Sequence, residues 1–308
     1  MIYSLIDSHC DTVTKALDNH VNLFNNGFHV DLAKVGDLDY TQFFAVFISP
    51  EYKNSARKRA MGGINKLKSE IYTHGDRVAF CVSYNDYLEN KGKIRAFLSL
   101  EGGEPITCIG DLEVLYREGI RMATLTWNFS NQLGAGVLEE DKSKGLTKLG
   151  RDIIMEMNRL GIIVDVSHLN DKSFWDVMEI TARPVVASHS NSRTICSNPR
   201  NLTDEQFKAV MNTGGVVGIN LYPVFLADSG EASIDGIIKH IEYFLSLGGE
   251  NNIGIGADFD GIEKTPEEIA GIQDMYKLFD RMLSLGYSEN LIKKLSCTNM
   301  ERILQEIL

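Results

Sequence analysis

The sequence predicts an α/β protein in which eight parallel strands close into a (β/α)8 barrel of the TIM type. Two observations support this fold class. Short apolar runs, typical of strands that are buried on both faces, alternate with amphipathic helical patterns along the chain. Five of the runs also end in carboxylate or imidazole side chains, and the carboxyl ends of barrel strands form the rim that carries active sites.

The predicted strands are spread over most of the chain. Those that end in carboxylate or imidazole side chains lie at residues 5–11, 97–101, 163–168, 185–189 and 253–258. Three further strand-like runs, at residues 43–48, 120–126 and 215–221, complete the set of eight.

Helical patterns separate these runs. In residues 149–160 the apolar side chains recur at the three- and four-residue spacing of one helix face, and Gly161 ends the pattern. Capping-box patterns at residues 203–206 and 265–268 predict two further helix starts. Similar apolar stripes predict helices at residues 233–247 and 289–307.

No linker, low-complexity tract or repeat indicates a second domain. We therefore expect one barrel domain over residues 1–308, with the charged, helical-looking segment near residues 50–93 as an excursion outside the barrel.

Composition limits the class of partner. The formal net charge of -11 argues against nucleic acid and against an anionic membrane surface. No apolar stretch approaches the ~20 residues that span a bilayer, and charged residues interrupt any N-terminal signal pattern. Five cysteines without a CxxC pair favour a reducing compartment. We expect a cytoplasmic protein that binds neither nucleic acid nor membranes.

The first polar strand end is an HxD motif formed by His9 and Asp11. Residues two apart on a strand face the same side, so one imidazole nitrogen and one carboxylate oxygen can reach the same cation. Taken alone, the motif fits a buried His–Asp pair equally well.

Glu101 ends a second strand, directly after four largely apolar residues. A carboxylate in such a position is rarely buried without a partner. A bridging role between two cations would supply that partner.

His168 and His189 each end an apolar strand directly after a serine. One such histidine is more often a core residue than a ligand. Two on successive strands, together with the HxD motif and Glu101, favour a metal site.

Asp258 ends the last strand within Gly-Ala-Asp-Phe-Asp-Gly. Phe259 occupies the last glycine position of a dinucleotide fingerprint, and the spacing of an EF-hand is also absent. The four other histidines, at positions 20, 29, 74 and 240, are predicted to lie on the surface.

In this order, the strand ends resemble the membrane (renal) dipeptidase family of zinc peptidases, and the chain looks like a soluble, bacterial-type member. The similar motifs cover essentially the whole chain, at residues 7–11, 100–103, 164–168, 188–190, 255–261 and 299–302. The resemblance implies an amidohydrolase-like (β/α)8 barrel with two Zn²⁺ per chain. It also implies cleavage of dipeptides, including those with a D-residue at the C-terminal position.

The resemblance also implies a set of metal ligands. One zinc ion would be bound by His9, Asp11 and Glu101. The second would be bound by His168, His189 and the same Glu101, which bridges the two ions.

The remaining site residues are likewise implied by the resemblance. Asp258 would be the catalytic aspartate, Arg200 would bind the substrate carboxylate, and Tyr222 would line the pocket. One position departs from the family, because Trp127 stands where characterised vertebrate members carry a histidine thought to polarise the scissile carbonyl. Trp127 is therefore expected to shape substrate preference.

The function that the resemblance implies is that of a binuclear zinc metallopeptidase, in which a metal-bridging hydroxide attacks the peptide bond of small dipeptides. Whether the chain forms a homodimer stays open. One alternative is another metal-dependent hydrolase, such as a cyclic amidase or deaminase. Such enzymes commonly use an HxH motif on the first strand, where this chain has HxD. A second alternative is a catalytically inactive binding relative.

Overall fold

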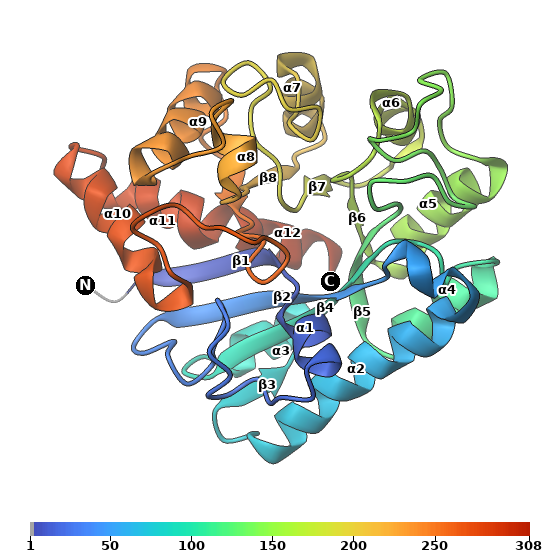
Figure 1. Ribbon diagram of the computed structural model, residues 1–308, viewed down its shortest axis with the longest axis horizontal. Coiled ribbons are helices and arrows are strands. Elements are labelled where there is room, and N and C mark those ends of the chain that lie inside the picture. Colours follow the sequence, from blue (N-terminus) through green and yellow to red (C-terminus); the bar gives the residue numbers. More distant parts are fainter. Residues whose placement is uncertain (1–2) are drawn as a thin grey trace.

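Eight parallel strands form a closed ring in the computed structural model, which describes residues 3–308 (Figure 1). The strands run in the ring order β2-β1-β9-β8-β7-β6-β5-β4, and pairing between β2 and β4 closes it. Their bounds are β1 Ser4–Cys10, β2 Asp39–Phe47, β4 Ile94–Glu101, β5 Ile120–Thr124, β6 Ile163–Asp165, β7 Val185–Ala187, β8 Val216–Ile219 and β9 Ile253–Ile255. The predicted barrel is thus confirmed.

A ninth strand, β3 (Val78–Phe80), lies within the segment predicted to be a helical excursion. It pairs with the amino half of β4, from Ile94 to Ala96. The neighbouring strand β5 pairs with β4 only from Leu98 onward, so β3 occupies the part of that strand edge that β5 leaves free.

Helices surround the ring, and the long helix α2 runs along its outside (Figure 1). The helices are α1 Thr12–Asp18, α2 Ala56–Thr73, α3 Tyr84–Glu89, α4 Ile109–Arg117, α5 Lys148–Leu160, α6 Asp171–Ile180, α7 Asp204–Asn212, α8 Pro223–Leu226, α9 Ile234–Ser246, α10 Met275–Ser284, α11 Glu289–Lys293 and α12 Asn299–Ile307. Short irregular turns of helix lie at Pro50–Ser55, Ile272–Asp274 and Lys294–Thr298. Within residues 3–308 no helix combines the length and the apolar character needed to cross a bilayer.

Two predicted helix boundaries are confirmed by their local backbone geometry and hydrogen bonds. Helix α5 is followed by Gly161, whose φ of 77° lies in the left-handed region that suits glycine at a helix end. Helix α7 begins with a capping box, because Thr203 and Gln206 each accept a hydrogen bond from the backbone N–H of the other.

The prediction that a helix starts at Thr265 is wrong. Residues 265–270 form only a turn, in which the Ile269 N–H donates to the Pro266 carbonyl. Glu268, the last residue of the capping-box pattern, instead accepts a hydrogen bond from the N–H of Ile234 at the start of α9. Glu268 thus caps helix α9 and does not start a helix of its own.

The surface prediction for His240 is also wrong, because this residue of α9 is fully buried. Its Nδ1 accepts a hydrogen bond from the Ser192 N–H, and its Nε2 donates to the Leu226 carbonyl. Burial lowers its pKa, so His240 is a neutral side chain that joins the loop of Ser192 and the end of helix α8 to α9.

The interior of the ring is filled by large side chains rather than by a channel. The rings of Phe43 and Phe97 stack with centroids 5.0 Å apart. Helix α12 adds apolar side chains to the same cluster. The members of this cluster include Ile6, Phe43, Phe97, Met122, Ile163, Val186, Val216, Met300 and Ile303. A packed barrel of this kind holds the strand ends of the rim in fixed positions.

Gly150 offers a test of how the long loop before α5 is held. A Cβ atom at residue 150 would lie 1.9 Å from the carbonyl oxygen of Leu133, so Gly150→Ala must displace that loop. We expect the free energy of unfolding to fall by about 1–3 kcal/mol in chemical denaturation.

Gly110→Ala is the matched control, because Gly110 also lies in the first turn of a helix but has only the Cys108 sulfur nearby, at 3.7 Å. The free energy of unfolding of the Gly110→Ala variant should stay unchanged or rise by about 0.5–1 kcal/mol. Equal effects of the two substitutions would contradict this account of the loop.

Candidate active site

The five side chains predicted to bind metal lie together at the carboxyl end of the barrel. His9 is in β1 and Asp11 directly follows it, and Glu101 is the last residue of β4. His168 follows β6 and His189 follows β7, and all five residues are buried. Parallel strands bring these distant positions to one rim, as the sequence predicted.

Glu101 lies between two groups of potential ligands. Its Oε2 is 3.5 Å from His9 Nε2, and that nitrogen is 3.5 Å from Asp11 Oδ2. Its Oε1 is 3.0 Å from His168 Nε2 and 3.8 Å from His189 Nε2. Each carboxylate oxygen therefore faces a different group, and both groups have their ligand atoms close enough to share one cation.

The electrostatics of this cluster also suit cations. Burial raises the pKa of Glu101 and of Asp258, and it lowers the pKa of His168 and of His189 well below the ordinary value. The Nε2 atom of His168 lies 2.8 Å from the Nε2 atom of His189. The Nε2 atom of His9 is buried and has no hydrogen-bond partner among the described residues. Neutral imidazoles with carboxylates form a donor set that binds transition metals such as zinc.

The outer nitrogens of two histidines are held by side chains that the sequence analysis missed. His189 Nδ1 is 2.7 Å from Ser188 Oγ, which donates a hydrogen bond of 2.6 Å to Asp165. His168 Nδ1 is 2.8 Å from Asn128 Oδ1. Such partners fix the tautomer and the orientation of ligating imidazoles. The residue directly before His189 was visible in the sequence, but its contact with Asp165 depends on the pairing of β6 with β7.

Asp258 stands at the edge of the same cluster. Its Oδ1 is 3.9 Å from His9 Nε2, and its Oδ2 accepts a hydrogen bond of 2.9 Å from Asn220 Nδ2. The φ angle of Asp258 is 61° and that of His168 is 67°, both in the left-handed region that non-glycine residues rarely adopt. Such backbone strain is concentrated at functional sites.

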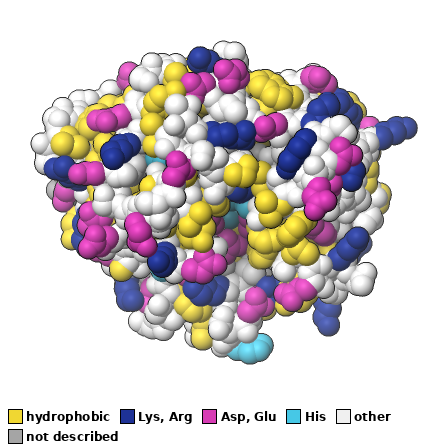
Figure 2. Space-filling view, turned by 45° about the horizontal axis from the view of Figure 1, so that its top comes forward, with side chains coloured by type: hydrophobic (Ala, Val, Ile, Leu, Met, Phe, Trp, Pro, Cys, Tyr) yellow, Lys and Arg dark blue, Asp and Glu magenta, His cyan; other side chains and the backbone are white. Residues whose placement is uncertain are grey.

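A cavity of about 520 Å³ opens above the cluster, a size in the usual range for small-molecule sites (~300–1,000 Å³). Figure 2 shows acidic and histidine side chains at the bottom of a hollow in this face, with hydrophobic side chains beside it. The side chains that line it include Asp11, Lys15, Phe47, Glu101, Trp127, Asn128, His168, Arg200, Tyr222, Phe225 and Asp258.

Arg200 reaches this cavity as a buried cation. Burial lowers the pKa of its guanidinium to about 10, which still leaves it charged at neutral pH. Its Nη2 donates to the His189 carbonyl at 3.4 Å, and the guanidinium lies 5.5 Å from the centroid of the Phe225 ring. Among the described residues no carboxylate lies within ion-pair distance of Arg200, and its Nε has no hydrogen-bond acceptor.

Tyr222 and Trp127 both line the cavity. The hydroxyl of Tyr222 donates to Glu263 at 2.8 Å. The ring of Trp127 packs against Phe47 and Phe129, with centroids 5.3 and 5.7 Å away. Trp127 is thus part of an aromatic wall.

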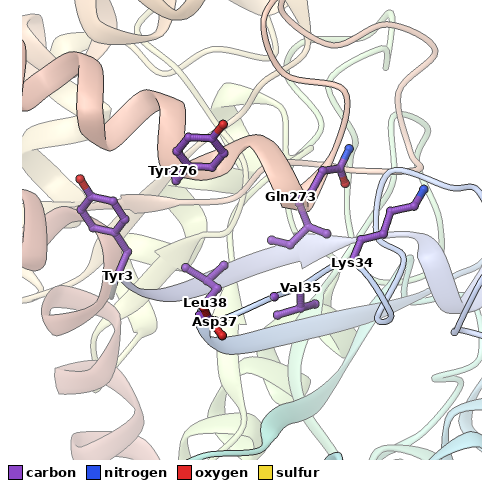
Figure 3. Close-up of a pocket in the computed structure, with 9 residues that line it drawn as sticks. Tyr3, Lys34, Val35, Asp37, Leu38, Gln273 and Tyr276 are labelled. Atoms are coloured by element: carbon purple, nitrogen blue, oxygen red, sulfur yellow. The ribbon is translucent and has the colours of Figure 1, made fainter. Parts of the chain in front are cut away.

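A smaller hollow, of about 230 Å³, lies next to the starts of β1 and β2 (Figure 3). Tyr3, Leu38 and Tyr276 line it, with Lys34 and Asp37 as its charged residues. It lies at the end of these strands opposite to the histidine cluster and has none of the ligands found there.

Comparison with known proteins identifies the family. A family model described as membrane dipeptidase (peptidase family M19) matches residues 2–308. The chain belongs to this family. It is accordingly a metal-dependent dipeptidase, which agrees with the resemblance seen in the sequence.

Related sequences and structures agree with this membership. An uncharacterized dipeptidase of Schizosaccharomyces pombe is 30% identical over 306 residues, covering 90% of this chain and 73% of the relative. An uncharacterized protein from the pqqA 5' region of Klebsiella pneumoniae is 35% identical, covering 78% of this chain and 93% of the relative. A Rhodobacter sphaeroides metallopeptidase, liganded with a phosphinate mimic of the dipeptide L-Ala-D-Ala, superposes with a TM-score of 0.91 at 26% identity, and both chains are covered completely.

Proposed function

We propose that the protein is a zinc-dependent dipeptidase that holds two Zn²⁺ ions and accepts dipeptides with a D-residue at the C-terminal position. The observation that carries this proposal is the buried, unpaired guanidinium of Arg200 beside the histidine cluster. A buried cation without a carboxylate partner suits an anionic ligand. The terminal carboxylate of a short peptide would be that ligand.

The donor set supports two ions. His9, Asp11 and Glu101 would hold one, and Glu101, His168 and His189 would hold the other. The two oxygens of Glu101 face the two groups separately, as a bridging ligand requires. When bound, the zinc ions would supply a hydroxide at neutral pH and polarise the scissile carbonyl.

Asp258 is the proton carrier in this proposal. Asn220 holds its Oδ2, while its Oδ1 faces His9 and the cavity. The Oδ1 atom can therefore take a proton from the attacking water and return it to the leaving amine.

Arg200 would set the length of the substrate. Its planar guanidinium can bind a carboxylate through two parallel hydrogen bonds, which a lysine cannot do. Arg200 is held beside the metal cluster by its hydrogen bond to the His189 carbonyl, so a dipeptide bound there would place its one peptide bond at the cluster, whereas a longer chain would not.

The tolerance for a C-terminal D-residue has a structural and a comparative basis. The cavity that Tyr222 and Trp127 line has a volume of about 520 Å³, which leaves room for a small side chain beside them. The Rhodobacter metallopeptidase with its L-Ala-D-Ala mimic is similar over the full length of this chain.

Substitution of single ligands tests the metal assignment. We expect His168→Ala or His189→Ala to lower the zinc content from two ions toward one per chain, because each residue contributes to one group only. Glu101→Ala should reduce the occupancy of both. Elemental analysis of zinc-loaded protein measures this, with His20→Ala, an exposed histidine, as the control that keeps two ions. Full double occupancy in all three ligand variants would refute the assignment.

Arg200→Ala tests the substrate clamp. We expect kcat/KM for dipeptides to fall by a factor that corresponds to about 2–5 kcal/mol, the usual loss when a buried charge pair is broken. The preference for dipeptides over their C-terminal amides should narrow as well. If that preference is unchanged in the variant, the carboxylate is bound elsewhere.

Trp127→Phe tests the wall of the cavity. The substitution keeps an aromatic ring but removes the indole N–H, and we expect it to change the ranking of dipeptide side chains. The loss in kcat should be far smaller than the ~10²–10³ typical of a lost oxyanion donor. A hundredfold fall for every dipeptide at full zinc occupancy would show that the indole N–H stabilises the transition state.

A further inference from the structure

The loop that follows β5 is hydrogen-bonded to the segment that contains His168. The N–H of Val137 donates to the His168 carbonyl at 2.8 Å, and the N–H of Leu138 donates to the Asn128 carbonyl at 2.8 Å. A Cβ atom at Gly136 would lie 2.6 Å from the Asn128 carbonyl oxygen, so the two parts of the loop pack backbone against backbone. Asn128 is therefore held in a fixed position next to His168.

The side chain of Asn128 has a defined orientation because of the imidazole that it contacts. His168 Nε2 faces Glu101 and His189, so this nitrogen is the one available to a cation and must carry no proton. Nδ1 then carries the proton and donates it to the atom 2.8 Å away, which must be the oxygen of Asn128. The Nδ2 amide group of Asn128 consequently points away from the ring.

This amide group has no acceptor within the described protein, and Asn128 lines the substrate cavity together with Arg200 and Glu101. Side-chain N–H groups can only donate. A dipeptide offers two kinds of acceptor near the metal cluster, the scissile carbonyl and the terminal carboxylate. Its ammonium group cannot pair with Nδ2.

We propose that Asn128 serves the site from both ends of its amide. Its Oδ1 positions His168 as a metal ligand, and its Nδ2 donates a hydrogen bond to an oxygen of the bound dipeptide. The second half of this assignment rests on the proposed dipeptidase function, whereas the first half requires only that the site binds metal.

Two substitutions separate these roles. Asn128→Asp keeps an oxygen for His168 but removes the donor, and Asn128→Ala removes both. Zinc affinity is measured by competition with a chelating indicator, and kcat/KM for a dipeptide is measured at saturating zinc.

For zinc affinity, we expect Asn128→Ala to weaken one of the two sites by about 10–100-fold, as is usual when the outer partner of a ligating histidine is lost. Asn128→Asp should stay within about threefold of the wild type, since a carboxylate oxygen serves His168 equally well. Unchanged affinity in Asn128→Ala would overturn the positioning role.

For catalysis at saturating zinc, both variants should lose a similar factor in kcat/KM, on the order of tenfold or more, because both lack Nδ2. A loss in Asn128→Asp alone would reflect repulsion by the new charge and would overturn the donor role. Wild-type activity in both variants would overturn it too.

Asn131→Ala is the matched control. Asn131 lies in the same loop, where its Nδ2 donates to the Leu125 carbonyl and its Oδ1 accepts from the Leu133 N–H. Its loss should lower thermal stability while both zinc affinities stay near those of the wild type. If the wild-type protein binds zinc but cleaves no dipeptide, the proposed function and the donor role both fail, and the zinc measurements still decide the positioning role.

Discussion

The buried carboxylate of Glu101 is stable in its ionised form only where positive charge lies beside its oxygens. An ionised carboxylate in an apolar interior costs several kcal/mol unless partners compensate it. The barrel supplies imidazole nitrogens on each side of this carboxylate, but burial lowers the pKa of His168 and of His189, so these two imidazoles stay neutral. In the site that we propose, cations shared between the carboxylate and the imidazoles would resolve both problems at once. The remaining features of the rim serve to hold these groups at the distances that such sharing needs.

The distances between the side chains of the rim depend on backbone segments that pack closely against one another and are partly strained. His168 and Asp258 both have positive φ angles, a conformation that costs about 1–3 kcal/mol for a non-glycine residue. Hydrogen bonds oppose this cost, since the His168 carbonyl accepts a hydrogen bond from the Val137 N–H, and the Asp258 N–H donates to the His9 carbonyl. Gly261 lets the backbone after Asp258 pass close to the side chain of Asp11, because a Cβ atom at residue 261 would lie 2.2 Å from Asp11 Oδ2.

The sequence predicted the barrel and the residues of its rim because both depend on periodic, local signals. Apolar runs mark buried strands, and a polar residue at the end of such a run lies at the rim whatever the details of packing. Features that depend on contacts between distant segments could not be predicted in this way. Strand β3 exists because β5 leaves part of β4 unpaired, and Glu268 caps α9 rather than a helix of its own.

The same reasoning explains why the outer partners of the histidines were missed. Their side chains are polar residues of ordinary appearance, and only the three-dimensional structure shows what they contact. Asp165 reaches His189 through Ser188 because β6 and β7 are paired, and Asn128 reaches His168 because its loop folds back on the rim. His240, in contrast, was predicted to lie on the surface because its helical pattern gave no sign that helix α8 and the loop of Ser192 would cover it.

The three histidines therefore differ in what orients them. The partner of His189 belongs to the barrel itself, and its position is fixed by the packed strands. The partner of His168 belongs to a loop that also forms a wall of the cavity through Trp127, and His9 Nδ1 has no hydrogen-bond partner among the described residues. Loops change between relatives more readily than barrel strands do. A change in this loop can thus alter the metal site and the shape of the cavity together, without replacing any ligand.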